Sequence, residues 1–358
     1  MKIAVYHNLT FGGGKKAFLE LEKRLSLKHY LTFFNLNIKV PGNFFSCQAF
    51  IYTSLKKIYL KLAKEIDKGK YDAVFVSHDY LTKSPYLLRY LKTPSVYLCQ
   101  ESWREFYEPS NIFASQLKSK IVNFIRYPLK KVDQDNVKKA TMVVANSDYS
   151  KMNLKKIYQR QIEKISLGVD NKKFKNLGFK RKSFFLSVGS LAKYKGMDFL
   201  IRSISLLPSK IRYPLVIVAA DGGLDEKYIK NLALQLKLKL IIKSKVNNQQ
   251  LIKLYNQAKL FLFAPYNEPF GLVTLEAMAC GLPVVGVNQG GLKEVIINGK
   301  NGWLTNRDEN EFSLIIINAL KQINLSFRKQ TTNLVKKWNW DKSTTELEKI
   351  LFKASKLK

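Results

Sequence analysis

A pair of glutamates eight residues apart marks the segment of the sequence with the most distinctive chemistry. Residues 267–285 read NEPFGLVTLEAMACGLPVV, which predicts a strand end, a turn that contains Glu268, and a helix from Leu272 to Cys280. Gly281 is typical of the position just after a helix. Gly271, where the helix begins, lets the backbone approach a ligand closely.

This helix begins where a predicted parallel strand ends, and open α/β sheets bind ligands at that edge. The N–H groups of its first turn and its dipole favour a phosphate there. Glu276 lies one turn further along, on the side of Leu272, where a carboxylate accepts hydrogen bonds from sugar or ribose hydroxyls. A second interpretation stays open from the pair alone: Glu268 stabilises the helix terminus electrostatically, and Glu276 is a solvated surface residue.

A second segment suited to phosphate is residues 188–196, VGSLAKYKG, between a predicted strand and a predicted helix. Its position places Lys195 at the same edge of the sheet as the glutamates. The alternative is an ordinary surface lysine, because the chain is rich in Lys.

A glycine triplet, Gly12, Gly13 and Gly14, follows the first predicted strand and precedes a helix over Lys15–Leu25. It is either a flexible turn or a glycine loop beside a ligand. It does not match the G-x-G-x-x-G fingerprint of dinucleotide-binding proteins.

The first half of the sequence carries its polar side chains just after predicted strands. His78 ends one such strand, where it either faces a ligand or is satisfied by the backbone. Residues 99–108, CQESWREFYE, combine Gln100, Glu101 and Arg104 with aromatic rings. Aromatic rings suit sugar faces and Arg suits phosphate, which favours a polar acceptor, but Glu and Arg can equally form an internal ion pair.

Short apolar runs alternate with longer helical patterns along the whole chain. Runs at 3–6, 73–76, 96–98 and 142–145 predict strands in the first half, and runs at 184–188, 215–219, 240–242, 260–264 and 283–287 predict strands in the second. Helices are predicted over residues 54–68, 197–207 and 248–257. Unbroken apolar runs are typical of strands buried on both faces of a parallel sheet. The pattern predicts an α/β protein with two doubly wound units.

The weakly patterned basic segment 170–183 is the expected linker between these units. We predict an N-terminal domain over residues 1–172, a second domain over 173–340 and a closing helix over 341–358, whose apolar residues fall on one face.

The formal net charge is +34, and only ten of the 61 basic residues are Arg. Such Lys enrichment reflects either genome composition or attraction to polyanions such as phospholipid surfaces, nucleic acid or nucleotide phosphates. No nucleic-acid recognition motif accompanies the charge, so no nucleic-acid partner is expected. Residues 113–139 read as basic helix with interleaved apolar residues, which either lies on an anionic membrane surface or packs on its own sheet.

Metal and disulfide chemistry find no support in the sequence. Cys47, Cys99 and Cys280 are far apart and form no C-x-x-C pair, and the three His residues do not cluster. The first residues read as a buried strand, and no run approaches the roughly 18 apolar residues of a membrane span. We expect no metal, no cofactor and a cytoplasmic protein, either free or peripheral on the inner face of the membrane.

Several of these segments resemble the retaining family-4 glycosyltransferases of the GT-B fold, within the glycosyl transferases group 1. The resemblance is strongest over 267–285, the E-x7-E region, and continues through GGLKEVI at 290–296 and NGKNGWL at 298–304. Weaker similarity covers ANSDYS at 145–150, LGVD at 167–170 with Phe174, and Trp340 before the closing helix.

The resemblance implies a first Rossmann-like domain that binds the acceptor, a second that binds a nucleotide-diphosphate sugar, and a cleft between them. Glu268 would lie beside the donor sugar, and Lys195 would hold the diphosphate and stabilise the leaving group. Glu276 would bind the ribose hydroxyls. Backbone groups at Phe270, Gly271 and Leu272 would bind the diphosphate, the stretch at Asn247 would contact the base, and Gly13 and Gly14 would lie near the phosphates.

Three departures from the family pattern are visible. Ser190 stands where the family has Arg, and a hydroxyl cannot replace a bidentate guanidinium. Gln100 stands near a position where many relatives have His, and Ala219 replaces an expected glycine. We therefore predict a retaining hexosyltransferase that acts on a glycan or lipid-linked acceptor in cell-envelope or glycan biosynthesis. The alternatives are a catalytically silent binding protein and a nucleotide-sugar epimerase on the same fold.

Overall fold

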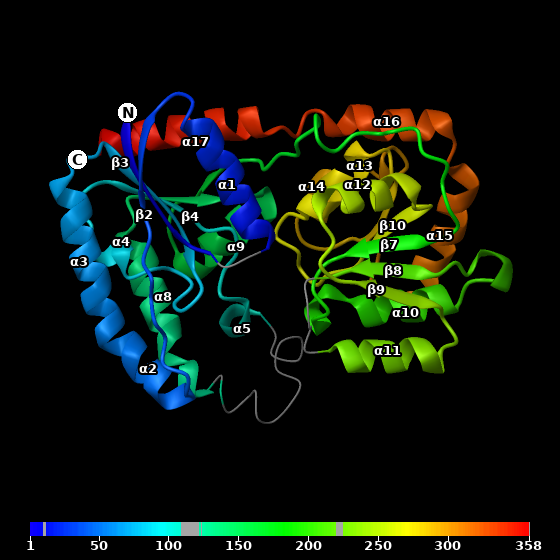
Figure 1. Ribbon diagram of the computed structural model, residues 1–358, viewed down its shortest axis with the longest axis horizontal. Coiled ribbons are helices and arrows are strands. Elements are labelled where there is room, and N and C mark those ends of the chain that lie inside the picture. The colour runs from blue at the N-terminus through cyan, green and yellow to red at the C-terminus, as the bar shows by residue number, and fades with distance from the viewer. Residues whose placement is uncertain (10–11, 109–121, 123, 220–224, 358) are drawn as a thin grey trace. The chain divides into compact units, whose positions relative to one another are not determined.

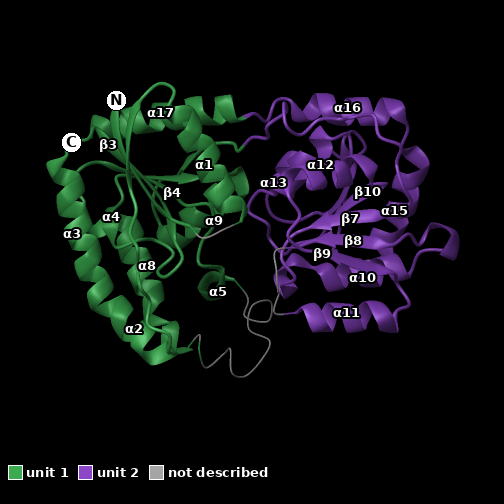
Figure 2. Cartoon of the chain, viewed as in Figure 1, with its two compact units in different colours: residues 1–167, 340–358 green, residues 168–339 purple. Residues whose placement is uncertain are grey.

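The computed structural model describes residues 1–9, 12–108, 122, 124–219 and 225–357. The chain forms two compact units (Figure 2). Unit 1 comprises Met1–Leu167 together with Trp340–Lys358, and unit 2 comprises Gly168–Asn339. The predicted boundary after residue 172 therefore differs from the observed one, which follows Leu167.

The expected linker 170–183 is anchored in unit 2. Phe174 packs edge-on against Tyr255 with their ring centroids 6.2 Å apart, and the Leu177 N–H donates to Asn256 Oδ1 at 2.7 Å. Arg181 donates to the backbone carbonyls at the C-terminal ends of two helices. The polar composition of this segment conceals these anchors, which explains the displaced boundary.

Unit 1 contains a six-stranded parallel sheet in the order β2-β1-β3-β4-β5-β6 (Figure 1). Its described strands are β1 (Lys2–Asn8), β2 (Tyr30–Phe34), β3 (Ala73–Asp79), β4 (Ser95–Leu98), β5 (Met142–Ala145) and β6 (Glu163–Lys164). Its described helices are α1 (Gly13–Leu25), α2 (Phe44–Tyr52), α3 (Ser54–Lys68), α4 (Leu87–Tyr90), α5 (Arg104–Tyr107), α8 (Pro128–Lys139), α9 (Asp148–Tyr158) and α17 (Trp340–Ser355). The strand order reverses between β1 and β3.

Helix α17 completes unit 1 although it follows unit 2 in the chain. It packs on α1 and reaches β3 and β4. Leu347 and Leu351, one turn apart on its apolar face, are fully buried. Arg24 of α1 pairs with Asp341 at 2.9 Å, at the exposed start of the helix. The closing helix is therefore an integral part of the core of unit 1.

Unit 2 repeats this plan with the order β12-β11-β10-β7-β8-β9. Its strands are β7 (Phe185–Val188), β8 (Leu215–Val218), β9 (Leu240–Lys243), β10 (Leu260–Phe263), β11 (Val284–Val287) and β12 (Gly302–Thr305). Its helices are the 3-10 turns η1 (Lys193–Lys195) and η2 (Ser209–Ile211), and α10 (Met197–Ser205), α11 (Glu226–Gln235), α12 (Asn248–Gln257), α13 (Leu272–Ala279), α14 (Leu292–Val295), α15 (Glu309–Gln322) and α16 (Leu325–Val335). Here the order reverses between β7 and β10.

Helices cover both faces of the unit 2 sheet, as parallel sheets require. Helix α10 contacts α11 and α15 on one face, and α13 contacts α12 and α16 on the other (Figure 1). All four residues of β10 are buried. The continuous apolar runs therefore did predict strands buried on both faces, and the predicted α/β fold with two doubly wound units is confirmed.

Three strands escaped prediction, all at or next to a sheet edge. β2 has only one neighbour, and none of the residues of its sequence YLTFF is fully buried, with Tyr30 and Phe33 exposed. β6 has two residues. β12 begins with Gly302, whose missing side chain makes room for the Val284 carbonyl.

Candidate functional site

The order of unit 2's sheet brings two separated segments of the sequence together. Because the order reverses between β7 and β10, the loops after these strands leave in opposite directions and open a crevice at their carboxyl ends. Lys195 follows β7 and Glu268 follows β10. The Lys195 Nζ lies 2.8 Å from Glu268 Oε2, and their side chains are 20% and 14% exposed. The pair is thus sheltered but reachable, unlike an ordinary surface lysine.

The loop that carries Lys195 is held against the end of β10. The Tyr266 N–H donates to the Tyr194 carbonyl at 2.8 Å. Gly196 adopts a positive φ of +66°, and a Cβ at this position would lie 2.0 Å from the Ala264 carbonyl oxygen. Only glycine fits this contact, so Gly196 sets how close Lys195 comes to the turn with Glu268.

The turn that carries Glu268 is held from its other side by the loop after β11. The Gly291 N–H donates to the Glu268 carbonyl at 2.8 Å. A Cβ on Gly290 would lie 2.4 Å from that carbonyl oxygen, and one on Gly291 would lie 2.3 Å from the Pro269 carbonyl. The Gly-Gly pair predicted only by resemblance thus has a local physical role: it lets two backbones pack directly together.

Helix α13 begins at Gly271, whose φ of +88° suits glycine, and no side chain caps this end. Glu268 therefore makes no capping hydrogen bond to the helix, while electrostatic stabilisation of this end by its charge stays open. The Thr274 N–H donates to the Gly271 carbonyl at 2.9 Å. The N–H groups that precede it in a helix lack an intrahelical partner, so at this end of α13 they favour an anion beside the Lys195–Glu268 pair. Thr274, in the first turn, is fully buried, and its hydroxyl has no hydrogen-bond partner among the described residues.

Glu276 is buried, with only 4% of its surface exposed, so the interpretation as a solvated surface residue is wrong. The Tyr255 hydroxyl donates to Glu276 Oε2 at 3.1 Å. Burial, reinforced by the Glu276 charge, raises the pKa of Tyr255, which keeps the phenol protonated as a donor. Because α13 is apolar on every side, this carboxylate is held within the unit rather than at its surface.

Ser190 and Asn247 are the remaining unit 2 candidates. The Ser190 hydroxyl is buried without a hydrogen-bond partner in the part of the chain that the structure describes. Asn247 caps α12: its side chain accepts from the Gln250 N–H and its own N–H donates to the Gln250 side chain, both at 2.9 Å. Because the side chain of this exposed residue caps α12, the predicted contact with the nucleotide base would fall to the backbone of the neighbouring residues.

In unit 1 the candidates Gly13, Gly14, His78 and Gln100 also lie at a reversal of strand order, between β1 and β3. The Gln100 side chain donates to the Gly14 carbonyl at 2.8 Å. A Cβ on Gly14 would lie 3.1 Å from the His78 ring. Burial, with a contribution from the Lys83 charge, lowers the pKa of His78 to about 3, so the imidazole is neutral near pH 7.

Glu101 and Arg104 each have an internal ionic partner. Lys83 Nζ lies 2.6 Å from Glu101 Oε1, and Arg104 forms a two-pronged pair with Glu108 at 2.8 and 3.0 Å. Burial alone would raise the pKa of Glu101, but Lys83, followed by His78 and Arg104, lowers it to about 2. Of the two interpretations left open by the sequence, the internal ion pair is therefore realised. A role in acceptor binding stays a prediction.

Comparison with known proteins identifies the unit that holds the Lys195–Glu268 pair. The model of the family "Glycosyl transferases group 1" matches residues 169–338, nearly the whole of unit 2. Unit 2 is a group 1 glycosyltransferase domain. An uncharacterized glycosyltransferase of Methanocaldococcus jannaschii is 34% identical over 176 residues, which cover 46% of this chain and 44% of that protein.

A more extended match is the alpha-1,3/1,6-mannosyltransferase of Schizosaccharomyces pombe, 24% identical over 78% of this chain and 61% of that protein. The chain thus spans less than two thirds of the length of these curated relatives. Among solved structures, sucrose-phosphate synthase of Thermosynechococcus elongatus has a TM-score of 0.77 at 18% identity, with 98% of both chains covered. HepE of Anabaena, in complex with UDP and glucose, has a TM-score of 0.75 at 18% identity over 98% and 99%. The chain has the GT-B fold of these glycosyltransferases.

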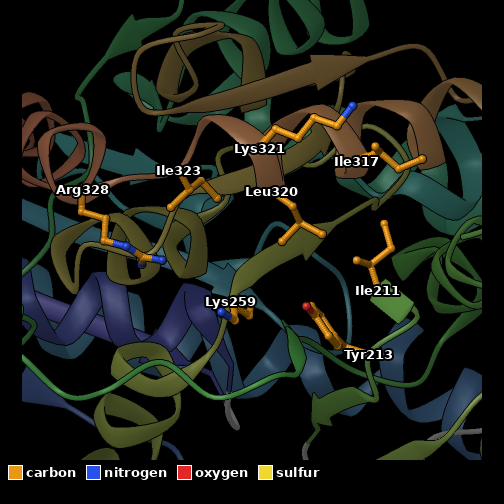
Figure 3. A pocket seen from close by; sticks show the side chains of 8 residues that line it. All are labelled: Ile211, Tyr213, Lys259, Ile317, Leu320, Lys321, Ile323 and Arg328. Atoms are coloured by element: carbon orange, nitrogen blue, oxygen red, sulfur yellow. The ribbon is translucent and has the colours of Figure 1, made fainter. Parts of the chain in front are cut away.

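A pocket of about 310 Å³ lies away from the candidate site of the glycosyltransferase domain (Figure 3). Tyr213 and Lys259, which precede β8 and β10, line it together with Leu320 and Arg328. It therefore lies at the amino edge of the sheet, opposite to Lys195 and Glu268. The described residues contain no group of three His, Cys, Asp or Glu able to hold a metal ion, and no helix among them is long and apolar enough to cross a membrane.

Two predicted segments extend beyond the described residues. Outside them lie most of residues 113–123, which belong to the predicted basic helix, and the glycines that follow Ala219. Of the rest of the basic segment, Phe124 and Tyr127 are exposed, whereas Leu129 is buried. The stretch thus splits into an exposed aromatic part and a part that packs on unit 1.

Sequence reasoning missed two residues of the glycosyltransferase domain that support the site. Tyr255, within a predicted helix, carries no sequence signal for a functional role, yet it hydrogen-bonds Glu276. Arg307 carried no signal at all, because a single Arg in a basic chain is unremarkable. It nevertheless donates to the carbonyls of Ala264 and Pro265 at the end of β10.

Proposed function

We propose that this protein is a retaining glycosyltransferase that transfers a hexose from a nucleotide-diphosphate sugar to a glycan or lipid-linked acceptor. The observation that carries the proposal is the Lys195–Glu268 pair, 2.8 Å apart, beside the uncapped start of α13 at the point where the strand order reverses. A diphosphate requires cations and N–H donors, and a sugar that loses its leaving group requires a nearby carboxylate.

In the proposed reaction, the bond between the sugar's anomeric carbon and the diphosphate oxygen breaks, and a bond to the acceptor oxygen forms. Lys195 and the α13 N–H groups stabilise the charge that develops on the departing diphosphate, which is the electrostatic effect that usually dominates. Glu268 stabilises the positive charge that develops on the sugar ring. The acceptor's hydroxyl proton leaves with the diphosphate, so the reaction balances without a metal or cofactor.

Glu276 is proposed to bind the ribose hydroxyls of the donor. Its buried carboxylate already accepts one hydrogen bond from Tyr255, and a carboxylate oxygen has further lone pairs to offer. HepE, whose structure contains UDP and glucose, supports UDP-sugars as the first donors to test. The polar acceptor is assigned to unit 1, within cell-envelope or glycan biosynthesis. If the acceptor is lipid-linked, the exposed Phe124 and Tyr127 of unit 1 support binding of the protein to a membrane surface.

The test is a panel of nucleotide sugars, scored by release of free nucleotide diphosphate with and without a membrane-lipid extract. If the protein transfers sugar, one donor should release its nucleotide diphosphate, the extract should stimulate this release, and the sugar should be found on a component of the extract. Glu276→Gln should weaken donor binding about 10- to 100-fold, since a hydrogen bond to a charged group contributes roughly 1.5–3 kcal/mol. Tyr255→Phe is the matched control, because it removes the neighbouring hydroxyl and keeps the carboxylate.

Silence of the wild type across the panel, with no nucleotide-diphosphate binding by calorimetry, would favour the catalytically silent binding protein. Conversion of the donor sugar to its epimer without transfer would favour the epimerase.

A further inference from the structure

Arg307 lies just after β12, two strands away from β10, yet its side chain reaches the end of β10. Its Nη2 donates to the carbonyls of Ala264 at 2.9 Å and Pro265 at 2.8 Å. Its Nε donates to Gln289 Oε1 at 3.2 Å. One guanidinium therefore joins the loop after β12 to the loops after β10 and β11, and these two loops hold the backbone of Glu268.

The flat face of the guanidinium completes the contact. Its central carbon lies 3.7 Å from the centroid of the Tyr266 ring, a close cation–π stack, and 5.2 Å from that of Phe199 in α10. Tyr266 stands two residues before Glu268, and its N–H donates to the Tyr194 carbonyl, next to Lys195. The stack thus fixes a residue of the Glu268 loop that hydrogen-bonds the Lys195 loop.

Arg307 also lies against the loop of Lys195 directly. A Cβ built on Gly196 would lie 3.2 Å from Arg307 Nη1 as well as 2.0 Å from the Ala264 carbonyl. Gly196, Ala264 and Arg307 are therefore packed without spare room. A shorter side chain at position 307 would leave a void under the Lys195 loop.

No ion pair between Arg307 and a carboxylate is found among the described residues, although the Asp198 charge acts on it. It contacts carbonyls, an amide and the Tyr266 side chain, and its Nη1 is buried without a hydrogen-bond partner among those residues. Burial lowers the pKa of Arg307, which reports the cost of enclosing this charge. A planar group with five N–H donors is the side chain able to make all of these contacts at once, and Lys is not equivalent.

We propose that Arg307 is a positioning residue that holds Lys195 and Glu268 at their working separation by cross-linking the loops after β7, β10, β11 and β12. Its consequence for transfer rests on the proposed function. Its consequence for the loops does not, because the hydrogen bonds and the stack exist without substrate.

Hydrogen exchange of the whole protein tests the loop contacts without any assay of activity. Arg307→Ala should speed exchange of the Tyr266 amide at least tenfold, and Arg307→Lys should speed it less. Arg212→Ala is the matched control, since Arg212 also binds a backbone carbonyl of unit 2, that of Leu207 at 2.8 and 3.0 Å. Arg212 precedes β8 and so lies at the amino edge of the sheet, opposite to the site. Unchanged exchange at Tyr266 in Arg307→Ala would overturn the proposal, whatever the activity.

A double-mutant cycle on transfer separates positioning from general loss of stability. Arg307→Ala should lower kcat about 10- to 100-fold in the wild type, because misplacement by about 1 Å can cost 100-fold. In a Lys195→Ala background the same change should lower kcat by a clearly smaller factor, since one of the two groups to be positioned is gone and their separation no longer matters. An equal loss in both backgrounds would contradict the proposal. If the wild type transfers no sugar, the proposed function fails, and the exchange experiment alone decides the role of Arg307.

Discussion

The two units have nearly the same plan, a six-stranded parallel sheet whose order reverses near one edge, but they treat the charged groups at that edge differently. In unit 1, Asp79 at the end of β3 is buried and accepts hydrogen bonds from Tyr59, Asn8 and the backbone of Leu81. In unit 2, the Lys195–Glu268 pair stays partly exposed beside the uncapped end of a helix.

The comparison shows that a position at the end of a strand does not by itself create a functional site. Lys83, Glu101, Arg104 and Glu108 in unit 1 neutralise one another, so a ligand gains little there unless a pair is broken. In unit 2 Lys195 and Glu268 also pair with each other, but they lie beside the uncapped start of α13, and glycines and Arg307 pack the surrounding loops. Changes in unit 2 should therefore affect chemistry, and changes in unit 1 should affect stability.

The sharpest test of this contrast is Glu268→Gln. Transfer should fall about 100- to 1,000-fold, since a charge that stabilises the transition state is lost. Nucleotide-diphosphate binding should be retained or tightened, because Lys195 loses its internal partner. Steady-state kinetics and calorimetry measure the two effects, and Glu226→Gln, in a surface pair with Lys230, serves as the control. Retained transfer would remove Glu268 from the mechanism.

Gly290→Ala should have the next largest effect. The new methyl group would lie 2.4 Å from the Glu268 carbonyl oxygen, so the turn must shift, and we expect at least a tenfold loss of transfer with reduced thermal stability. Gly178→Ala is the matched control: its φ of +71° is equally unfavourable for Ala, but nothing lies within 4 Å of the added Cβ. It should cost about 1–2 kcal/mol of stability and no activity. Equal loss of activity in both variants would contradict direct packing on Glu268.

Ser190→Arg should test the contrast between the units by a gain, an increase in the donor affinity of unit 2. The serine hydroxyl has no hydrogen-bond partner among the described residues, and a guanidinium there can bind a diphosphate with two parallel hydrogen bonds. We expect donor affinity to rise about tenfold, measured by calorimetry with the nucleotide diphosphate. Unchanged affinity would show that position 190 does not face the donor.

The smallest expected effect lies in unit 1. The pKa of Glu101, held at about 2 mainly by Lys83 against the effect of burial, is below its ordinary value of 4.5. The pair therefore stabilises the fold above pH 4.5, and this contribution is lost as the pH falls toward 2. Lys83→Ala should lower stability by at most about 1 kcal/mol at pH 7, since the Glu101 side chain is 36% exposed, and by less at pH 3.5. Urea unfolding at both pH values measures this, and a pH-independent loss would argue against the ion pair.

Much of the fold follows from local patterns. The apolar runs of β3, β5, β7, β8 and β10 predicted buried strands, and the motif around Glu268 predicted a helix after a strand end. The apolar residues on every side of α13 also indicate that Glu276 is buried. The periodicity of LVTLEAMA leaves no solvent-facing stripe.

The neighbours across the sheet could not be predicted in the same way. Lys195 and Glu268 are 73 residues apart, and their contact depends on β10 pairing with β7, which no local pattern specifies. Arg307 is 43 and 42 residues from the carbonyls of Ala264 and Pro265 that it binds, and no pattern marks these acceptors, because any residue presents a carbonyl. Lys83 and Glu101 meet only because β3 and β4 are adjacent.

One feature of the chain path bears on how the protein is made. The chain enters unit 2 near Val169 and leaves it near Trp338, and the Val169 N–H donates to the Trp338 carbonyl at 3.2 Å. Unit 2 therefore begins and ends at neighbouring points. During synthesis unit 2 is complete once Asn339 has emerged, whereas unit 1 still lacks α17. Because domains fold as units when their chain is available, unit 2 is expected to fold on the ribosome while unit 1 waits for its last helix.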